Sequence, residues 1–179
     1  MNIKKLALFS FGIFLLTFSG HAQRIAVKTN SLGWLTASPN IEAELVFNNH
    51  FSVNVGVMGN YLKTQSFKSS FTHFQPEVRY WFSRPMVRHF IGATAFINNF
   101  DFLVKNKIHK GDAWATGLTY GYAWAINSRW NIEATAGVGL LKYRQFKYGK
   151  EETKPNEIND KRTLLAPIKL GLSIAYIIK

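Results

Sequence analysis

The chain has 179 residues, the length of one ordinary domain, and it contains no cysteine. Disulfides, thiolate metal sites and cysteine nucleophiles are therefore excluded. Aromatic residues make up 15% of the chain and charged residues only 18%, below the roughly 25% of a typical soluble domain. The formal net charge is +12, which favours anionic partners.

The chain opens with the pattern of a secretory signal peptide. Lys4 and Lys5 precede a mostly apolar run, and Ala22 ends a small-x-small cleavage site. The run is shorter than the roughly 20 residues of a membrane-spanning helix, so we expect cleavage, with 1–22 as the signal and 23–179 as the mature domain. Because export is expected, the positive charge predicts contact with surface polyanions such as lipopolysaccharide, and not with nucleic acid.

After the signal, apolar and polar residues alternate with the period of two that indicates β-strands. In 41–47, for example, Ile41 and Ala43 share one face, opposite Glu42 and Glu44. Eight such segments are predicted, at residues 24–30, 40–47, 51–61, 71–82, 89–100, 112–126, 130–143 and 163–178.

The later segments carry the same alternation. Large and small residues alternate in 112–126, which fits a narrow barrel with the large residues outside. In 163–178, Ile168 and Leu170 are predicted on one face, opposite Lys169.

The connections between these segments alternate in length. Short ones are predicted at 48–50, 83–88 and 127–129, and longer ones at 31–39, 62–70, 101–111 and 144–162. Outer-membrane barrels alternate long extracellular loops with short periplasmic turns in this way. We therefore predict an all-β fold, an eight-stranded antiparallel up-and-down transmembrane β-barrel in the outer membrane of a Gram-negative bacterium. An even number of strands would leave both mature termini periplasmic.

The polar face helps to decide between a membrane barrel and a soluble one, because a soluble barrel keeps its apolar face inside. An eight-stranded lumen has room only for side chains, so charges buried there must pair. The inward set would hold three cations and four carboxylates, which can neutralise one another. This predicted lumen ion-pair network consists of Lys28, Glu42, Glu44, Glu77, Arg79, Glu133 and Lys169.

Aromatic and basic residues near the strand ends predict contacts at a membrane surface. Tyrosine and tryptophan rings favour the bilayer interface, and Trp81 and Trp114 are among those assigned to it. Basic residues in or beside the long connections would meet lipopolysaccharide phosphates. These residues are Lys63, Lys68, Lys105, Lys107, Lys110, Lys142, Arg144, Lys147 and Lys150.

Several local motifs, taken in order, resemble a known family. They are Lys28-Thr29-Asn30, Pro76-Glu77-Val78-Arg79-Tyr80-Trp81, Gly121-Tyr122-Ala123-Trp124 and Arg129-Trp130-Asn131-Ile132-Glu133. Their order and spacing resemble the Bacteroidota family catalogued as domain of unknown function 3575, over nearly the whole mature chain. The resemblance implies a small outer-membrane barrel, in some cases encoded beside fimbrial components, with no established activity.

One combination of residues suggests catalysis. His50 and Ser52 are predicted on one strand face near Glu42 and Glu44, as in a Ser-His-carboxylate site of a lipid A-modifying enzyme. The predicted topology places both beside a periplasmic turn, away from lipid A, and a polar turn explains them equally well. His73 lies nearer the extracellular end but lacks a serine partner, so we expect it to complete lumen hydrogen bonds.

No metal or cofactor pattern is found. His109 with Asp112, and the segment 156–160, match no ligand spacing of known type. We expect no catalytic residues and no cofactor. The leading hypothesis is a non-enzymatic outer-membrane barrel that contacts outer-membrane lipid and lipopolysaccharide, with a structural or surface-interaction role linked to fimbrial or cell-surface assembly. The alternatives are a lipid A deacylase or acyltransferase, and a soluble periplasmic lipid-binding barrel. The oligomeric state stays open.

Overall fold

The computed structural model describes residues 24–64, 67–104, 106–153 and 155–178. The predicted signal peptide, 1–22, lies outside this part of the chain. The strands are β1 (Ile25–Asn30), β2 (Asn40–Val46), β3 (Phe51–Lys63), β4 (Lys68–Trp81), β5 (Arg88–Val104), β6 (Lys107–Ala125), β7 (Trp130–Gly149) and β8 (Asp160–Ile177), and the helix α2 (Ser31–Leu35) follows β1.

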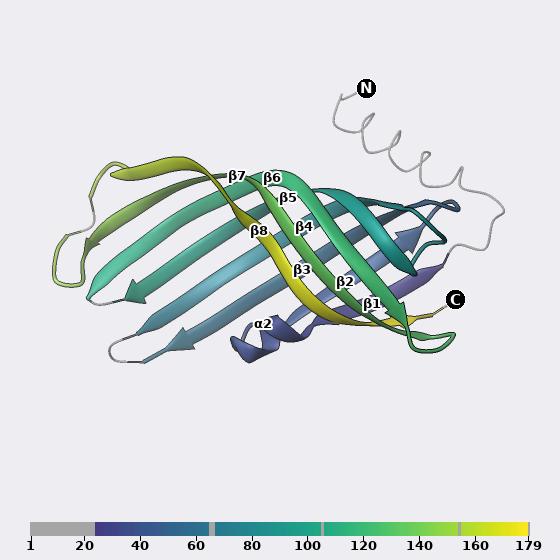
Figure 1. Ribbon diagram of the computed structural model, residues 1–179. Helices are drawn as coiled ribbons and strands as arrows, with labels where there is room; N and C mark the ends of the chain where they lie inside the picture. The colour runs from purple at the N-terminus through teal and green to yellow at the C-terminus, as the bar shows by residue number, and fades with distance from the viewer. Residues whose placement is uncertain (1–23, 65–66, 105, 154, 179) are drawn as a thin grey trace, which may run out of the picture.

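The eight strands form one closed antiparallel sheet. Each strand pairs with its neighbours in the chain, and β1 pairs with β8, so the sheet closes into a barrel. The short turns lie at the same side of the barrel as the start of β1 and the end of β8, and we call this the termini end (Figure 1). The β3–β4, β5–β6 and β7–β8 hairpins lie at the opposite side, which we call the hairpin end. The predicted strand number and up-and-down order are confirmed.

The strands extend further toward the hairpin end than the sequence predicts. The predicted loop 101–111 is mostly strand, since β5 continues to Val104 and β6 begins at Lys107. Cross-strand pairing stabilises this extension, because Asp101 lies opposite Lys110 on the neighbouring strand.

A five-residue helix, α2, replaces part of the predicted loop 31–39. Asn30 caps it, since its side-chain oxygen accepts a hydrogen bond from the Leu32 amide at 3.1 Å. The hydroxyl of Ser31 donates to the Leu172 carbonyl at 2.6 Å, which ties the helix to β8. The β1–β2 hairpin is therefore short and folded against the barrel, while the other three hairpins project beyond it (Figure 1).

The barrel is apolar outside and polar inside. Outward-facing Ile41, Leu118 and Leu170 are 53%, 67% and 69% exposed, whereas Glu77 and Arg79 are at most 1% exposed. The predicted alternation of faces is therefore present, with the charged face in the lumen. Among the described residues, no helix is long and apolar enough to cross a membrane.

The prediction for Ile168 is wrong because β8 contains an irregularity. Val138 pairs with Pro167 and Gly137 pairs with Lys169, so Ile168 is an extra residue on β8. Its side chain turns inward and is 7% exposed, while Lys169 keeps its predicted inward position.

The interface assignment of Trp81 is also wrong. Trp81 faces the lumen, where its ring lies 4.6 Å from that of Phe90 and packs with Ala123. Its indole N–H donates to Ser52 Oγ at 2.8 Å, so both its apolar and its polar parts are satisfied inside. Trp114, by contrast, is exposed on the outward face.

Gly121 gives a first test of lumen packing. A Cβ atom there would meet the Phe90 ring and lie 2.8 Å from the Ala134 carbonyl oxygen. We expect Gly121→Val to lower the free energy of unfolding by about 1–3 kcal/mol through overpacking, measured by urea unfolding. In the control Gly59→Ala, the added Cβ meets only the Phe71 carbonyl, at 3.1 Å, so an equal loss there would contradict this packing argument.

Candidate functional site

Arg79, on β4, lies at the centre of the lumen cluster and is fully buried. Its guanidinium lies 2.7 Å from Glu77 Oε2, 3.0 Å from Glu44 Oε2 and 3.0 Å from Glu133 Oε1. The guanidinium carbon also stands 4.4 Å from the centroid of the Phe90 ring. Only arginine offers five N–H donors in a planar group, so it can serve three carboxylates at once.

Two lysines complete the cluster. Lys28, on β1, lies 2.6 Å from Glu133 and also pairs with Glu44. Lys169, on β8, lies 2.9 Å from Glu77 and 3.5 Å from Glu42. The structure thus brings together all the residues of the predicted network, in a cluster that we call the charge plug: Lys28, Glu42, Glu44, Glu77, Arg79, Glu133 and Lys169.

Neutral side chains surround the carboxylates of the charge plug. Ser52 donates to Glu44, and Thr119 donates to Glu77. Asn54 donates to Glu42 at 2.6 Å, and the Thr135 hydroxyl lies 3.0 Å from Glu133 Oε1. Sequence reasoning missed these roles, although each residue occupies an inward position of its strand. The added hydrogen bonds make burial of the charges tolerable, because a buried ion pair needs its remaining lone pairs satisfied.

The candidate Ser-His-carboxylate combination does not assemble. His50 precedes β3, its Nδ1 lies 2.9 Å from the Trp81 carbonyl oxygen, and its ring stacks on outward-facing Tyr80. Ser52 faces the lumen and is engaged by Glu44 and Trp81. The prediction that His50 and Ser52 share a strand face is therefore wrong, because the chain turns before β3 begins.

The other histidines of interest lie beside glutamine side chains. His73 faces the lumen, with Nε2 3.5 Å from Gln75 Oε1 and its ring 4.8 Å from that of Phe96. His109 Nδ1 lies 3.2 Å from Gln145 Oε1. In the described part of the chain, no group of three or more histidines and carboxylates could hold a metal ion.

The basic residues predicted to bind lipopolysaccharide gather toward the hairpin end, where several have acidic neighbours. Lys68 lies 2.6 Å from Asp101, and Arg144 lies 2.9 Å from Asp112. Lys142 stands 5.9 Å from the centroid of the Trp114 ring. Lys105 lies outside the described residues. The others in this region are Lys63, Lys107, Lys110, Lys147 and Lys150.

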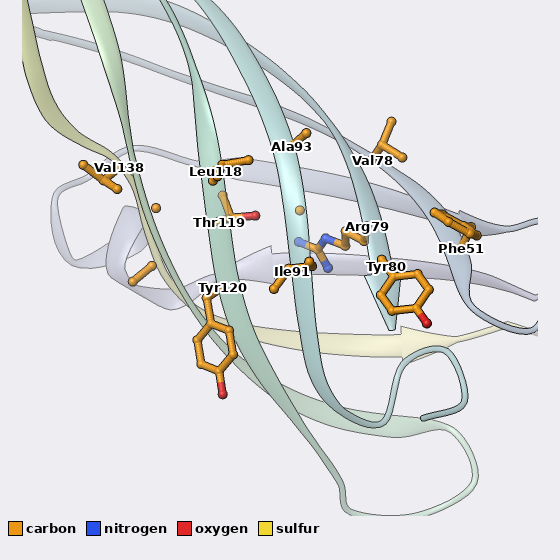
Figure 2. Close-up of a pocket in the computed structure, with 13 residues that line it drawn as sticks. Phe51, Val78, Arg79, Tyr80, Ile91, Ala93, Leu118, Thr119, Tyr120 and Val138 are labelled. Carbon is orange, nitrogen blue, oxygen red and sulfur yellow. The ribbon is translucent and has the colours of Figure 1, made fainter. Parts of the chain in front are cut away.

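An apolar hollow of about 690 Å³ lies on the outward face of β4–β7, close to the charge plug but outside the wall (Figure 2). Val78 and Leu118 border it, and the rings of Tyr80 and Tyr120 point toward the termini end. Its surface is almost entirely hydrocarbon, so it presents no arrangement of polar groups for catalysis.

Fold and side chains together define a small closed barrel with an apolar exterior and an ion-paired lumen. The chain belongs to the family described as "Protein of unknown function (DUF3575)", whose pattern matches residues 8–178. The resemblance noted in the sequence is thereby confirmed at the level of the family. No curated protein matches the chain.

Proposed function

We propose that the protein is a small outer-membrane β-barrel without enzymatic activity, acting in surface structure or in surface interactions. The observation that carries this proposal is the inverted distribution of residues, since the outward face is apolar and the lumen is charged. A barrel dissolved in water has the opposite arrangement, while a barrel in lipid needs this one.

The width of the apolar outer surface supports the same proposal. On β7 the outward residues stay apolar from Trp130 to Leu140, and the charged residues Lys142 and Arg144 follow. This matches the 9–11 residues of a tilted strand in a bilayer. Trp130 and Trp114 lie near the two margins of the apolar surface, where rings favour the interface. The hairpin end would then be extracellular, and the termini end periplasmic.

The charge plug supports a structural or docking role over a transport role. Seven ionisable side chains fill the lumen of an eight-stranded barrel, which has little room beyond its own side chains. The projecting hairpins and their basic residues are the parts available to lipopolysaccharide or to a surface or fimbrial protein.

Two alternatives receive less support from the geometry. A lipid A-modifying enzyme needs an activated nucleophile, and the hydroxyl of Ser52 is engaged by Glu44 and Trp81 inside the lumen. A soluble lipid-binding barrel needs an apolar lumen, and the aliphatic side chains here face outward.

Fractionation and gel mobility test the proposal. We expect the protein in the outer-membrane fraction, and we expect unboiled samples to migrate differently from boiled ones, because a barrel stabilised in lipid stays folded in detergent. Recovery as a soluble periplasmic protein with no heat-dependent shift would contradict the proposal.

A further inference from the structure

The apolar hollow on the outward face of β4–β7 exists because two of its outward residues are small. Ala93, on β5, lies opposite Leu118, and Ala136, on β7, lies opposite Tyr120. The larger side chains stand around the two methyl groups, and a depression of about 690 Å³ remains between them. This volume falls within the range of about 300–1,000 Å³ that small-molecule sites occupy.

The hollow extends from the middle of the apolar surface toward the termini end. Leu118 lies midway along the apolar part of β6, and Tyr120 is the next outward residue toward the termini end. The rings of Tyr80 and Tyr120 form the rim on that side (Figure 2). The Tyr120 hydroxyl lies 2.6 Å from His89 Nδ1, and the His50 ring stacks on Tyr80. The rim therefore separates hydrocarbon from the polar end of the barrel, with the Tyr120 hydroxyl already engaged by the protein.

The turn between β4 and β5 places two arginines beyond this rim. It spans residues 82–87 and joins two of the strands that line the hollow. Arg84 lies in the turn, Arg88 is the first residue of β5, and both are exposed. Arg88 precedes Ile91, which lines the hollow, by three residues, or about 10 Å along the strand. Both guanidinium groups can therefore reach the headgroup of a lipid whose chain occupies the hollow.

The acidic side chains of the protein lie away from these arginines. The chain has ten acidic residues, of which four belong to the charge plug. The other six lie toward the hairpin end and are Asp101, Asp112, Glu151, Glu152, Glu157 and Asp160. Among the described residues, Arg84 and Arg88 have no ion-pair partner, whereas Lys68 and Arg144 at the hairpin end pair with aspartates. The turn is thus a site of uncompensated positive charge.

An apolar hollow beside uncompensated cations fits an anionic amphiphile. A zwitterionic headgroup would also bring an ammonium group to the termini end, where the described residues offer no acidic side chain to receive it. A second copy of the chain fits less well. Two copies that met at their hollows about a two-fold axis along the membrane normal would bring their arginines together at the same depth, where like charges repel.

We propose that the hollow and the β4–β5 turn together bind a phospholipid with an anionic headgroup, of the phosphatidylglycerol type. One acyl chain lies in the hollow beside Ala93 and Ala136, and the phosphate lies against Arg84 and Arg88. In the proposed orientation, this site belongs to the periplasmic leaflet. The inference rests on the proposed membrane location, because it requires the hollow to face lipid.

Titration of the folded mature protein in a neutral detergent, followed by native mass spectrometry, tests the inference with phosphatidylglycerol and with phosphatidylethanolamine of the same chains. We expect the wild type to bind phosphatidylglycerol about tenfold more tightly, because each arginine near an anionic lipid contributes several-fold. Combining Arg84→Gln with Arg88→Gln should abolish this preference. The matched control combines Lys107→Gln with Lys110→Gln, which removes two exposed charges at the hairpin end, and should keep it.

The acyl-chain contact has its own pair of variants. Ala93→Trp should fill the hollow and weaken phosphatidylglycerol binding several-fold. Ala95→Trp changes the next outward residue of β5, which does not line the hollow, and binding should be unchanged.

Four outcomes would overturn the inference. Three are equal affinity of the wild type for the two lipids, loss of the preference in the lysine control, and equal effects of Ala93→Trp and Ala95→Trp. The fourth is a stable dimer that Ala93→Trp breaks and phosphatidylglycerol does not, since a second copy would then occupy the hollow. Recovery of the protein from the periplasm as a soluble protein would contradict the membrane location itself, and the inference with it, which fractionation reveals independently.

Discussion

Replacing Arg79 by methionine should lower the free energy of unfolding by about 3–5 kcal/mol, the usual cost of removing one partner from a buried ionic cluster. Arg79 contacts Glu44, Glu77 and Glu133, and all four residues are nearly or fully buried. Without the guanidinium, the three carboxylates would face one another with only the lysines to neutralise them. Urea unfolding of the protein in lipid vesicles, followed by tryptophan fluorescence, measures the loss.

Three further variants separate the charge plug from ordinary surface charge. Arg144→Met breaks the pair with Asp112, whose side chains are 66% and 48% exposed, so we expect a loss below about 1 kcal/mol. The loss caused by Arg79→Lys should fall between the losses caused by Arg144→Met and Arg79→Met, because a lysine ammonium keeps the charge but lacks the planar set of N–H donors of arginine. Adding Glu133→Gln to Arg79→Met should recover part of the loss. If Arg79→Met cost no more than Arg144→Met, the charge plug would not be a structural element.

The charged lumen could be predicted from the sequence because strand geometry is strict. Period-two alternation places Glu42 and Glu44 on one face, and Glu77 and Arg79 on one face. Pairing follows from charge balance, since a narrow lumen cannot hold unpaired ions. The alternation could not predict which inward residues contact one another, such as the simultaneous contact of Arg79 with three carboxylates. Those contacts depend on how far strands distant in the sequence are shifted relative to one another.

The features that sequence reasoning missed depend on local backbone changes or on tertiary contacts. One extra residue at Ile168 reverses the face of the residues before it. Helix α2 depends on the Asn30 cap and on its contact with β8, which a five-residue segment does not reveal. The extension of β5 and β6 into the predicted loop 101–111 depends on cross-strand pairing, and strand ends are the least certain part of any such prediction.

Leu118→Arg should cost about 2–4 kcal/mol if the outward face lies in lipid, because a charge on the lipid face near the bilayer midplane is strongly unfavourable. Leu118 is 67% exposed and lies midway along the apolar part of β6, between Trp114 and Trp124. Its neighbours across the strands, Ala93 and Val138, offer no charge to pair with an arginine. Unfolding in vesicles and assembly into the outer membrane both report the effect.

The matched control moves the same charge along the same outward face toward the hairpin end. Asn99 is exposed and lies opposite Asp112, in the polar region above the apolar surface, so Asn99→Arg should cost at most about 1 kcal/mol. The difference between the two variants therefore reports depth in the bilayer and not the presence of a new arginine. In a barrel surrounded by water the order would reverse, since arginine at position 118 would replace an exposed apolar side chain with a hydrated one. Equal or better stability of Leu118→Arg would thus disprove the proposed membrane location, whatever the lumen contains.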